Sequence, residues 1–176
     1  MKYPLSLRVL HWLMAAMILG LIAVGFYMAG IPSDAADKYA LYPMHKAIGF
    51  MVLVLLLVRV PTRLRGKIPS APEGLEKWEV NLSHVIHILL YVAMFTIAFS
   101  GYMMNSTFQY VDGLDLFGLF TVPDITEKSE YWNGVFHTVH SISAWVLSIS
   151  LALHIAGALK HRFLDAPEND VLKRMV

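Results

Sequence analysis

The sequence predicts an all-α integral membrane protein, a bundle of four helices with both ends of the chain in the cytoplasm. Three observations predict this class. The 176 residues are 57% hydrophobic with a mean hydropathy of +0.56, above the values of ordinary soluble domains. Four apolar runs are long enough to cross a bilayer as helices, for which ~20 residues suffice. Lysine and arginine gather in the segments that lie on one side of these runs.

We expect one domain over residues 1–176, with spans at about 9–29, 42–61, 80–104 and 135–160. The first run follows Lys2 and Arg8, so a signal peptide is a competing interpretation. This run is long for the apolar part of a signal peptide, and three further spans follow it. We therefore expect it to be retained as the first helix. Prolines, glycines and charges predict loops at 30–41 and 62–79.

The connection over residues 112–130 is the longest and is acidic, with Lys128 as its only cation. Its GLDLFGLF piece, residues 113–120, combines apolar and polar positions. We expect this piece to lie along the membrane surface as a short amphipathic segment.

The orientation follows from the distribution of cations. With four spans, one side holds Lys2, Arg8, Arg59, Arg63, Arg65, Lys67, Lys77, Lys160, Arg162, Lys173 and Arg174, and the other holds Lys38, Lys46 and Lys128. Cytoplasmic segments carry the excess of Lys and Arg. Both termini are therefore expected in the cytoplasm, and the multi-pass chain in an inner (plasma) membrane.

The composition also excludes several kinds of site. The chain has no cysteine, which rules out disulfides, thiolate-bound iron-sulfur clusters and covalent c-type haem attachment. The net charge of +1 and the lack of a basic patch interleaved with aromatic residues give no indication of nucleic-acid binding. Metal chemistry would have to use histidine, methionine or carboxylates.

Histidines within the apolar runs are the most informative residues. The fourth run has no charged residue between Glu130 and Lys160, yet it contains His137, His140 and His154. On a helix, His140 and His154 lie about 40° apart around the axis and roughly 21 Å apart along it. His137 is rotated about 100° from His154 and ranks below His140. An imidazole within a membrane indicates a functional site, although a hydrogen bond to a neighbouring helix is the plainer alternative.

Depth in the membrane pairs these histidines with two others. His11 opens an outward-going span and His45 an inward-going one, so His11 shares its depth with His154, and His45 with His140. Two facing imidazoles in an apolar bundle suit a non-covalent haem, whose iron takes one axial ligand from each side. Zinc fits less well, because each depth offers few other ligands. With both axial positions filled by protein, electron transfer is the expected task.

Other polar residues of the spans have weaker interpretations. His84 and His87 lie on one face and could contact haem propionates, bind a quinone carbonyl, relay protons or only face interfacial water. His161 could contact an inner propionate or be solvated, and His137 is equally ambiguous. Lys46 either reaches the headgroups or pairs with an outer propionate or an anionic substrate. Arg59 is expected to anchor its span. No catalytic residue can be assigned.

These residues resemble the bacterial cytochrome b561 family of four-helix, di-haem membrane proteins. The resemblance covers nearly the whole chain. It rests on HWL at 11–13, on His45 followed by Gly49 and Arg59, on SHVIH at 83–87, and on HSISAWVLSISLALH at 140–154 followed by His161.

The resemblance implies two haem b groups, with His11, His154, His45 and His140 as iron ligands. It also implies a superoxide oxidase-like activity that passes electrons from superoxide at the outer face to ubiquinone. Related cytochromes serve as quinone-linked subunits of larger complexes.

Three functions therefore stay open. The first is a di-haem electron carrier that exchanges electrons with membrane quinone, with superoxide as the candidate donor. The second is a cytochrome b subunit that links a periplasmic redox partner to quinone. The third is a haem-free, histidine-lined transporter or proton channel. Seven acidic residues against three basic ones on the outer side would repel superoxide and would favour a positively charged protein donor.

Overall fold

The computed structural model describes all residues from 1 to 176 and consists mainly of four long helices. They are α1 (Leu5–Gly30), α2 (Tyr42–Arg65), α3 (Lys77–Thr107) and α4 (Glu130–Phe163). All four are long and apolar enough to cross a membrane, which confirms the all-α four-helix bundle. Each helix includes the corresponding expected span and extends beyond it.

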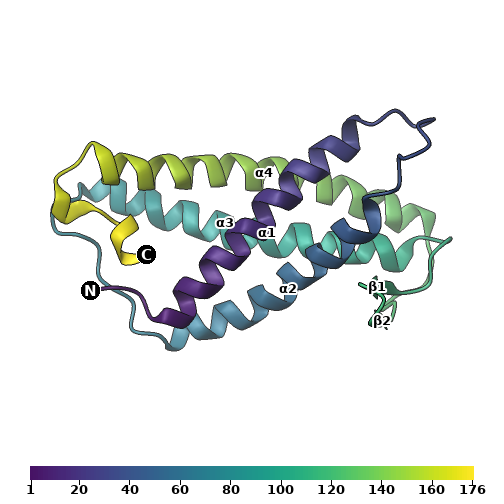
Figure 1. Cartoon of the computed structure of the whole chain (residues 1–176), viewed down its shortest axis with the longest axis horizontal. Helices are drawn as coiled ribbons and strands as arrows, with labels where there is room; N and C mark the ends of the chain where they lie inside the picture. Colours follow the sequence, from purple (N-terminus) through teal and green to yellow (C-terminus); the bar gives the residue numbers. More distant parts are fainter.

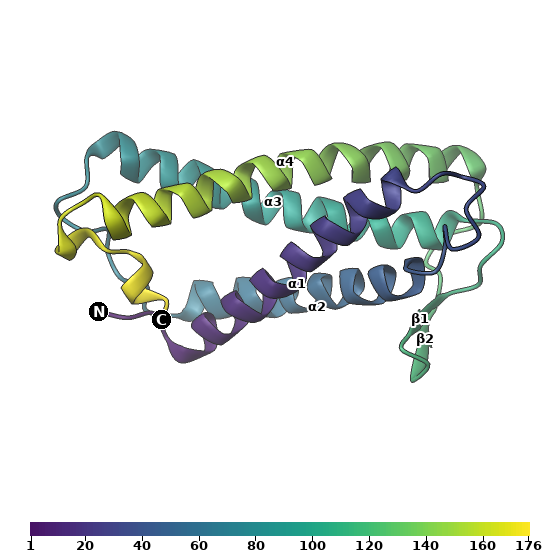
Figure 2. The ribbon, with the colours of Figure 1, turned by 45° about the horizontal axis from the view of Figure 1, so that its top comes forward.

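The two ends of the bundle differ. Both termini lie at one end, here called the terminal end, and the β1–β2 hairpin lies at the other, here called the hairpin end (Figures 1 and 2). Helix α1 packs against α2, α2 against α3, and α3 against α4. Helices α1 and α4 meet through rings, with centroids 4.9 Å apart between Phe26 and Trp145 and 6.1 Å apart between His11 and His154.

An apolar layer fills the middle of the bundle. It is made of residues from all four helices: Met14, Ile18, Val52, Leu56, Ile86, Leu90, Ala93 and Leu147. Many other apolar side chains face outward, among them Leu57 and Ile149, each 59% exposed. Water would disfavour such a surface, whereas lipid tails cover it without cost. The fold therefore has a thin internal core and a lipid-facing exterior.

Side chains cap the starts of α3 and α4, whereas α1 and α2 have no side-chain cap. Glu76 and Glu79 form a capping box at the start of α3, and the Ser129 side chain accepts a hydrogen bond from the Trp132 backbone at the start of α4. Helix α2 instead runs through Pro61 to Arg65. A proline removes one helical hydrogen bond, and here that loss falls near the helix end.

The segment expected to lie flat as an amphipathic piece is instead a β-hairpin. Strands β1 (Leu114–Leu116) and β2 (Phe120–Val122) pair antiparallel. The Leu119 backbone N–H donates to the Leu116 carbonyl over 3.0 Å, and both Phe117 and Gly118 have positive φ, as a tight type I′ turn requires. Leu114 and Leu116 are buried while Asp115 is exposed, which is the alternation of a strand.

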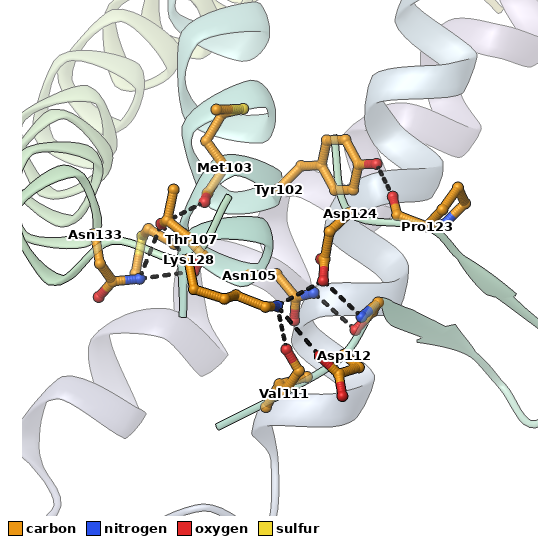
Figure 3. A network of polar contacts seen from close by, with 12 residues as sticks. Tyr102, Met103, Asn105, Thr107, Val111, Asp112, Pro123, Asp124, Lys128 and Asn133 are labelled. Carbon is orange, nitrogen blue, oxygen red and sulfur yellow. Dashed lines mark hydrogen bonds and ion pairs between the residues drawn. The ribbon is translucent and has the colours of Figure 1, made fainter. Parts of the chain in front are cut away.

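Polar groups fasten the base of this hairpin to the helices (Figure 3). The Asn105 side-chain amide donates to the Gly113 carbonyl over 2.8 Å, and the Gly113 N–H donates to Asp124 over 3.0 Å. Lys128 pairs with the same Asp124 carboxylate. Gly113 has φ +70°, and a Cβ there would lie 2.9 Å from the Val122 carbonyl oxygen, so only glycine fits.

Candidate functional site

Four histidines meet in two pairs, one toward each end of the bundle. The rings of His11 on α1 and His154 on α4 have centroids 6.1 Å apart in the half nearer the terminal end. Those of His45 on α2 and His140 on α4 have centroids 6.5 Å apart in the half nearer the hairpin end. The structure thus brings together the residues that the depth argument pairs.

The separation within each pair suits a metal ion bound between two imidazoles. When two imidazoles bind one ion from opposite sides with metal–nitrogen bonds of about 2 Å, their ring centroids lie roughly 6 Å apart. Both observed distances are close to this value. Each pair therefore has a ring separation that suits two imidazoles on opposite sides of one ion.

Hydrogen bonding gives His140 a defined orientation. Its Nδ1 lies 2.9 Å from the Ile97 carbonyl oxygen, and because a carbonyl can only accept, Nδ1 carries the proton and donates it. The other ring nitrogen then keeps its lone pair for a metal, the arrangement usual for ligating histidines. Its partner His45 has a buried Nδ1 with no hydrogen-bond partner, an orphaned polar atom at the same site.

Two glycines give these imidazoles room. A Cβ on Gly25 of α1 would lie 3.3 Å from Cε1 of His45, and one on Gly101 of α3 would lie 3.2 Å from Cε1 of His140. Any larger residue would push the ring. Gly157 of α4 has no atom within 4 Å of such a Cβ, so it plays no comparable part.

A cation lies beside the pair nearer the terminal end. Arg59 on α2 donates to the Tyr91 hydroxyl over 3.1 Å and to the Leu7 carbonyl over 3.2 Å, and its third nitrogen lies 3.4 Å from Nδ1 of His11. None of these partners is a carboxylate. Beyond any role in anchoring its span, Arg59 therefore lies beside a histidine pair, where its charge has no acidic counterpart.

A third imidazole joins this pair. The ring centroid of His87 lies 5.3 Å from that of His154, closer than two ligands on opposite sides of one ion would be. It is half-buried, whereas His84 and His137 are exposed. Of the two histidines on α3, His84 and His87, only His87 lies beside the pair of His11 and His154.

His161 lies instead in a separate polar cluster. Its Nδ1 is 2.6 Å from Asp165, and the neighbouring Lys160 ammonium donates to Glu79 over 2.6 Å and to Asp165 over 3.0 Å. The hydrogen bond from His161, followed by that from Lys160, holds the pKa of Asp165 below its ordinary value. The cluster ties the end of α4 to the start of α3.

The side chain of Lys46 bonds within the protein and forms no ion pair with an acidic residue. Its ammonium donates to the Asn105 side-chain oxygen over 3.1 Å, and Lys46 is half-buried next to His45. An amide oxygen does not neutralise a charge. Lys46 therefore leaves a positive charge beside the pair nearer the hairpin end.

Comparison with known proteins shows the family of the chain. The model of the prokaryotic cytochrome b561 family matches residues 2–176. The chain belongs to the prokaryotic cytochrome b561 family. This cytochrome is also 27% identical over 177 residues to cytochrome b561 homolog 2 of Escherichia coli (strain K12), covering 99% of its own length and 91% of that relative.

Membership makes the chain a multi-pass bacterial membrane protein that transfers electrons and binds haem b. The residues present fit such a group: imidazole donors at a suitable separation, an orphaned ring nitrogen on His45 and glycines that clear space around two rings. Gly25, Asn105 and Asp165 also make contacts in this structure, but the sequence pattern does not reveal which residues they lie against. Those contacts depend on how the helices rotate against one another.

Proposed function

We propose that this cytochrome binds two haem b groups, one that His11 and His154 would hold and one that His45 and His140 would hold. The observation that carries the proposal is the presence of two imidazole pairs, at 6.1 and 6.5 Å, in opposite halves of one bundle. When bound, haem b supplies one-electron oxidation and reduction. Two such sites allow electrons to cross the membrane.

The chain's own residues orient the ligands and set the electrostatics. The Ile97 carbonyl fixes the tautomer of His140. Arg59 and Lys46 each place an uncompensated positive charge near one pair, which favours the negatively charged haem propionates and the reduced state. The apolar layer between the two pairs excludes water. Together these features support an electron path through a dry interior.

The cation count supports an inner-membrane orientation with both termini in the cytoplasm. The terminal end and its connections carry eleven Lys and Arg residues against three at the hairpin end. The hairpin end then faces the periplasm, and the pair of His45 and His140 receives electrons from outside.

For the overall reaction we propose superoxide as donor and membrane quinone as acceptor. Two superoxide ions give up one electron each and leave as oxygen, and one quinone takes the two electrons with two protons to become quinol. The charge on Lys46, which lacks an acidic partner, supports attraction of an anion to this site.

A second candidate is a periplasmic protein donor. The hairpin end, with its connections and adjoining helix starts, holds seven acidic residues against three basic ones, and such a field favours a positively charged partner. The cytochrome would then link that partner to the quinone pool.

Haem-loaded protein in lipid vesicles tests these alternatives. With superoxide supplied, we expect haem bands to become reduced and quinol to form when quinone is added. Lys46→Gln should lower the second-order rate with superoxide a few-fold, more at low salt than at high salt. Lys38→Gln is the control, because Lys38 is a cation of the same end of the bundle whose ammonium bonds to the carbonyls of Met28 and Ile31 and to no group of the pair.

The outcomes separate the three functions. Reduction by superoxide with quinol formation supports the first. Haems that superoxide leaves oxidised, but that a basic periplasmic protein reduces, support the second. A purified protein with no haem absorption band would contradict both and would favour a histidine-lined transporter or proton channel.

A further inference from the structure

The β1–β2 hairpin lies beside the helix ends rather than beyond them. Leu114 and Leu116 of β1 are each 3% exposed and pack with Ala47 of α2 and Tyr102 of α3. Ala47 is five residues into α2, about 7.5 Å along its axis at ~1.5 Å per residue. Figure 2 shows the hairpin projecting sideways, across the bundle axis. The hairpin therefore reaches the depth of the first turns of a membrane span.

The tip of the hairpin is apolar and uncovered. Phe117 is 49% exposed, Leu119 81% and Phe120 61%. The acidic residue nearest the tip is Asp115, whose carboxylate accepts a hydrogen bond from the Gly118 N–H over 2.9 Å and so serves the turn. Three large apolar side chains within four residues thus point away from the protein.

The backbone holds Phe117 in an unfavourable conformation. It is the only residue other than glycine with a positive φ, at 58°, which is strained for a bulky side chain. Burial within the chain does not offset this cost, because the side chain is half exposed. Transfer of an aromatic ring into the lipid interface, where aromatic residues are enriched, would offset it.

The depth of the tip identifies what covers it. Met44, in the first turn of α2 and one helical turn from Ala47, is 54% exposed, so this side of the helix presents an apolar surface of the kind that lipid covers. A water-soluble partner would have to displace lipid to reach this level. Lipid is therefore the occupant that the position favours over a docked protein.

We propose that Phe117, Leu119 and Phe120 insert into the lipid interface beside α2 and anchor the hairpin there. The anchor keeps Leu114 and Leu116 packed over Ala47, two residues from His45. It thereby holds the hairpin against the turn of α2 that carries His45. This inference does not depend on the number of haems or on the electron donor.

Spin labelling of the full, haem-loaded chain in phosphatidylcholine and phosphatidylglycerol vesicles tests the anchor. The chain has no cysteine, so Leu119→Cys provides a single labelling site. Ile149→Cys, on the lipid-facing middle of α4, is the lipid reference, and Asp112→Cys, whose side chain is fully exposed, is the aqueous reference. The readout is the collision rate of the label with oxygen, which concentrates in lipid, and with a water-soluble nickel chelate.

A ratio of oxygen to nickel collisions at Leu119→Cys that lies between the ratios at Asp112→Cys and Ile149→Cys is the expected result for a residue in the interface. A ratio equal to that at Asp112→Cys would place the tip in water and overturn the proposal. Low collision rates with both reagents would show the tip covered by protein, a second copy or a partner, and would also overturn it. Phe120→Cys repeats the measurement if labelling at Leu119 disturbs the turn.

Discussion

The orientation of each imidazole depends on its immediate neighbours. His140 is fixed by a carbonyl on one side and by Gly101 on the other, where an added Cβ would lie 3.2 Å from the ring. His45 has the same kind of limit from Gly25. Volume changes at these glycines are therefore transmitted directly to the proposed iron ligands.

Gly101→Ala is expected to disturb one haem and leave the other unchanged. The new methyl group must displace the His140 ring, and overpacking of this kind costs about 1–3 kcal/mol. The absorption spectrum and midpoint potential of one haem should shift, and thermal stability should fall. Gly157→Ala is the control, because nothing lies within 4 Å of its Cβ. Identical spectra and potentials in both variants would contradict the prediction.

The sequence predicts the histidine pairs because helical rise and span direction alone set the depth of a residue. It cannot predict that Ile97 supplies the carbonyl for His140, or that Arg59 reaches both Tyr91 and His11. Those contacts depend on the rotation and tilt of each helix, which apolar runs facing lipid on most sides do not specify. For the same reason the closeness of His87 to His154 is not visible in the spacing.

At the level of elements, the link between α3 and α4 depends on an acidic side chain. Asp165 accepts from His161 and Lys160, and Lys160 also binds Glu79 on α3. A carboxyl group whose pKa is lowered in the folded protein stabilises the fold at pH values above its ordinary pKa near ~4. That contribution is lost as the pH falls through the lowered value.

Asp165→Asn is therefore expected to lower the thermal unfolding temperature at neutral pH. As the pH falls below about 4, the unfolding temperature of the variant should decrease less than that of the native protein. Unfolding of both proteins in detergent across this range measures the effect. Glu127→Gln, at an exposed position in the 112–130 connection, should leave the pH profile of the native protein unchanged. Superimposable profiles of Asp165→Asn and the native protein would show that this link does not contribute.

The secondary structure of the hairpin segment could not be predicted from its sequence pattern. The LDL sequence of β1 has strand alternation, but a run this short does not distinguish a strand from a turn of amphipathic helix. Partners distant in sequence decide the outcome: Tyr102 and Asn105 from α3 bond to Pro123 and Gly113. The long helices were predictable because apolar length alone determines them.

Across the whole molecule, charge separates the two ends and predicts how the chain is inserted. Single cysteines can report this because the native chain has none. A membrane-impermeant thiol reagent applied to intact cells should label Asp112→Cys, at the hairpin end, and should leave Lys173→Cys, at the terminal end, unlabelled until the cells are opened. The reverse pattern would place the termini in the periplasm.

The haem-to-protein ratio of purified His140→Ala, compared with the native chain, tests the two-site arrangement most directly. We expect two haem b per native chain and one per variant chain, with the spectrum of the haem assigned to His11 and His154 retained. A native ratio below two, or a variant that keeps both haems with an unchanged reduced spectrum, would contradict ligation by these two imidazole pairs.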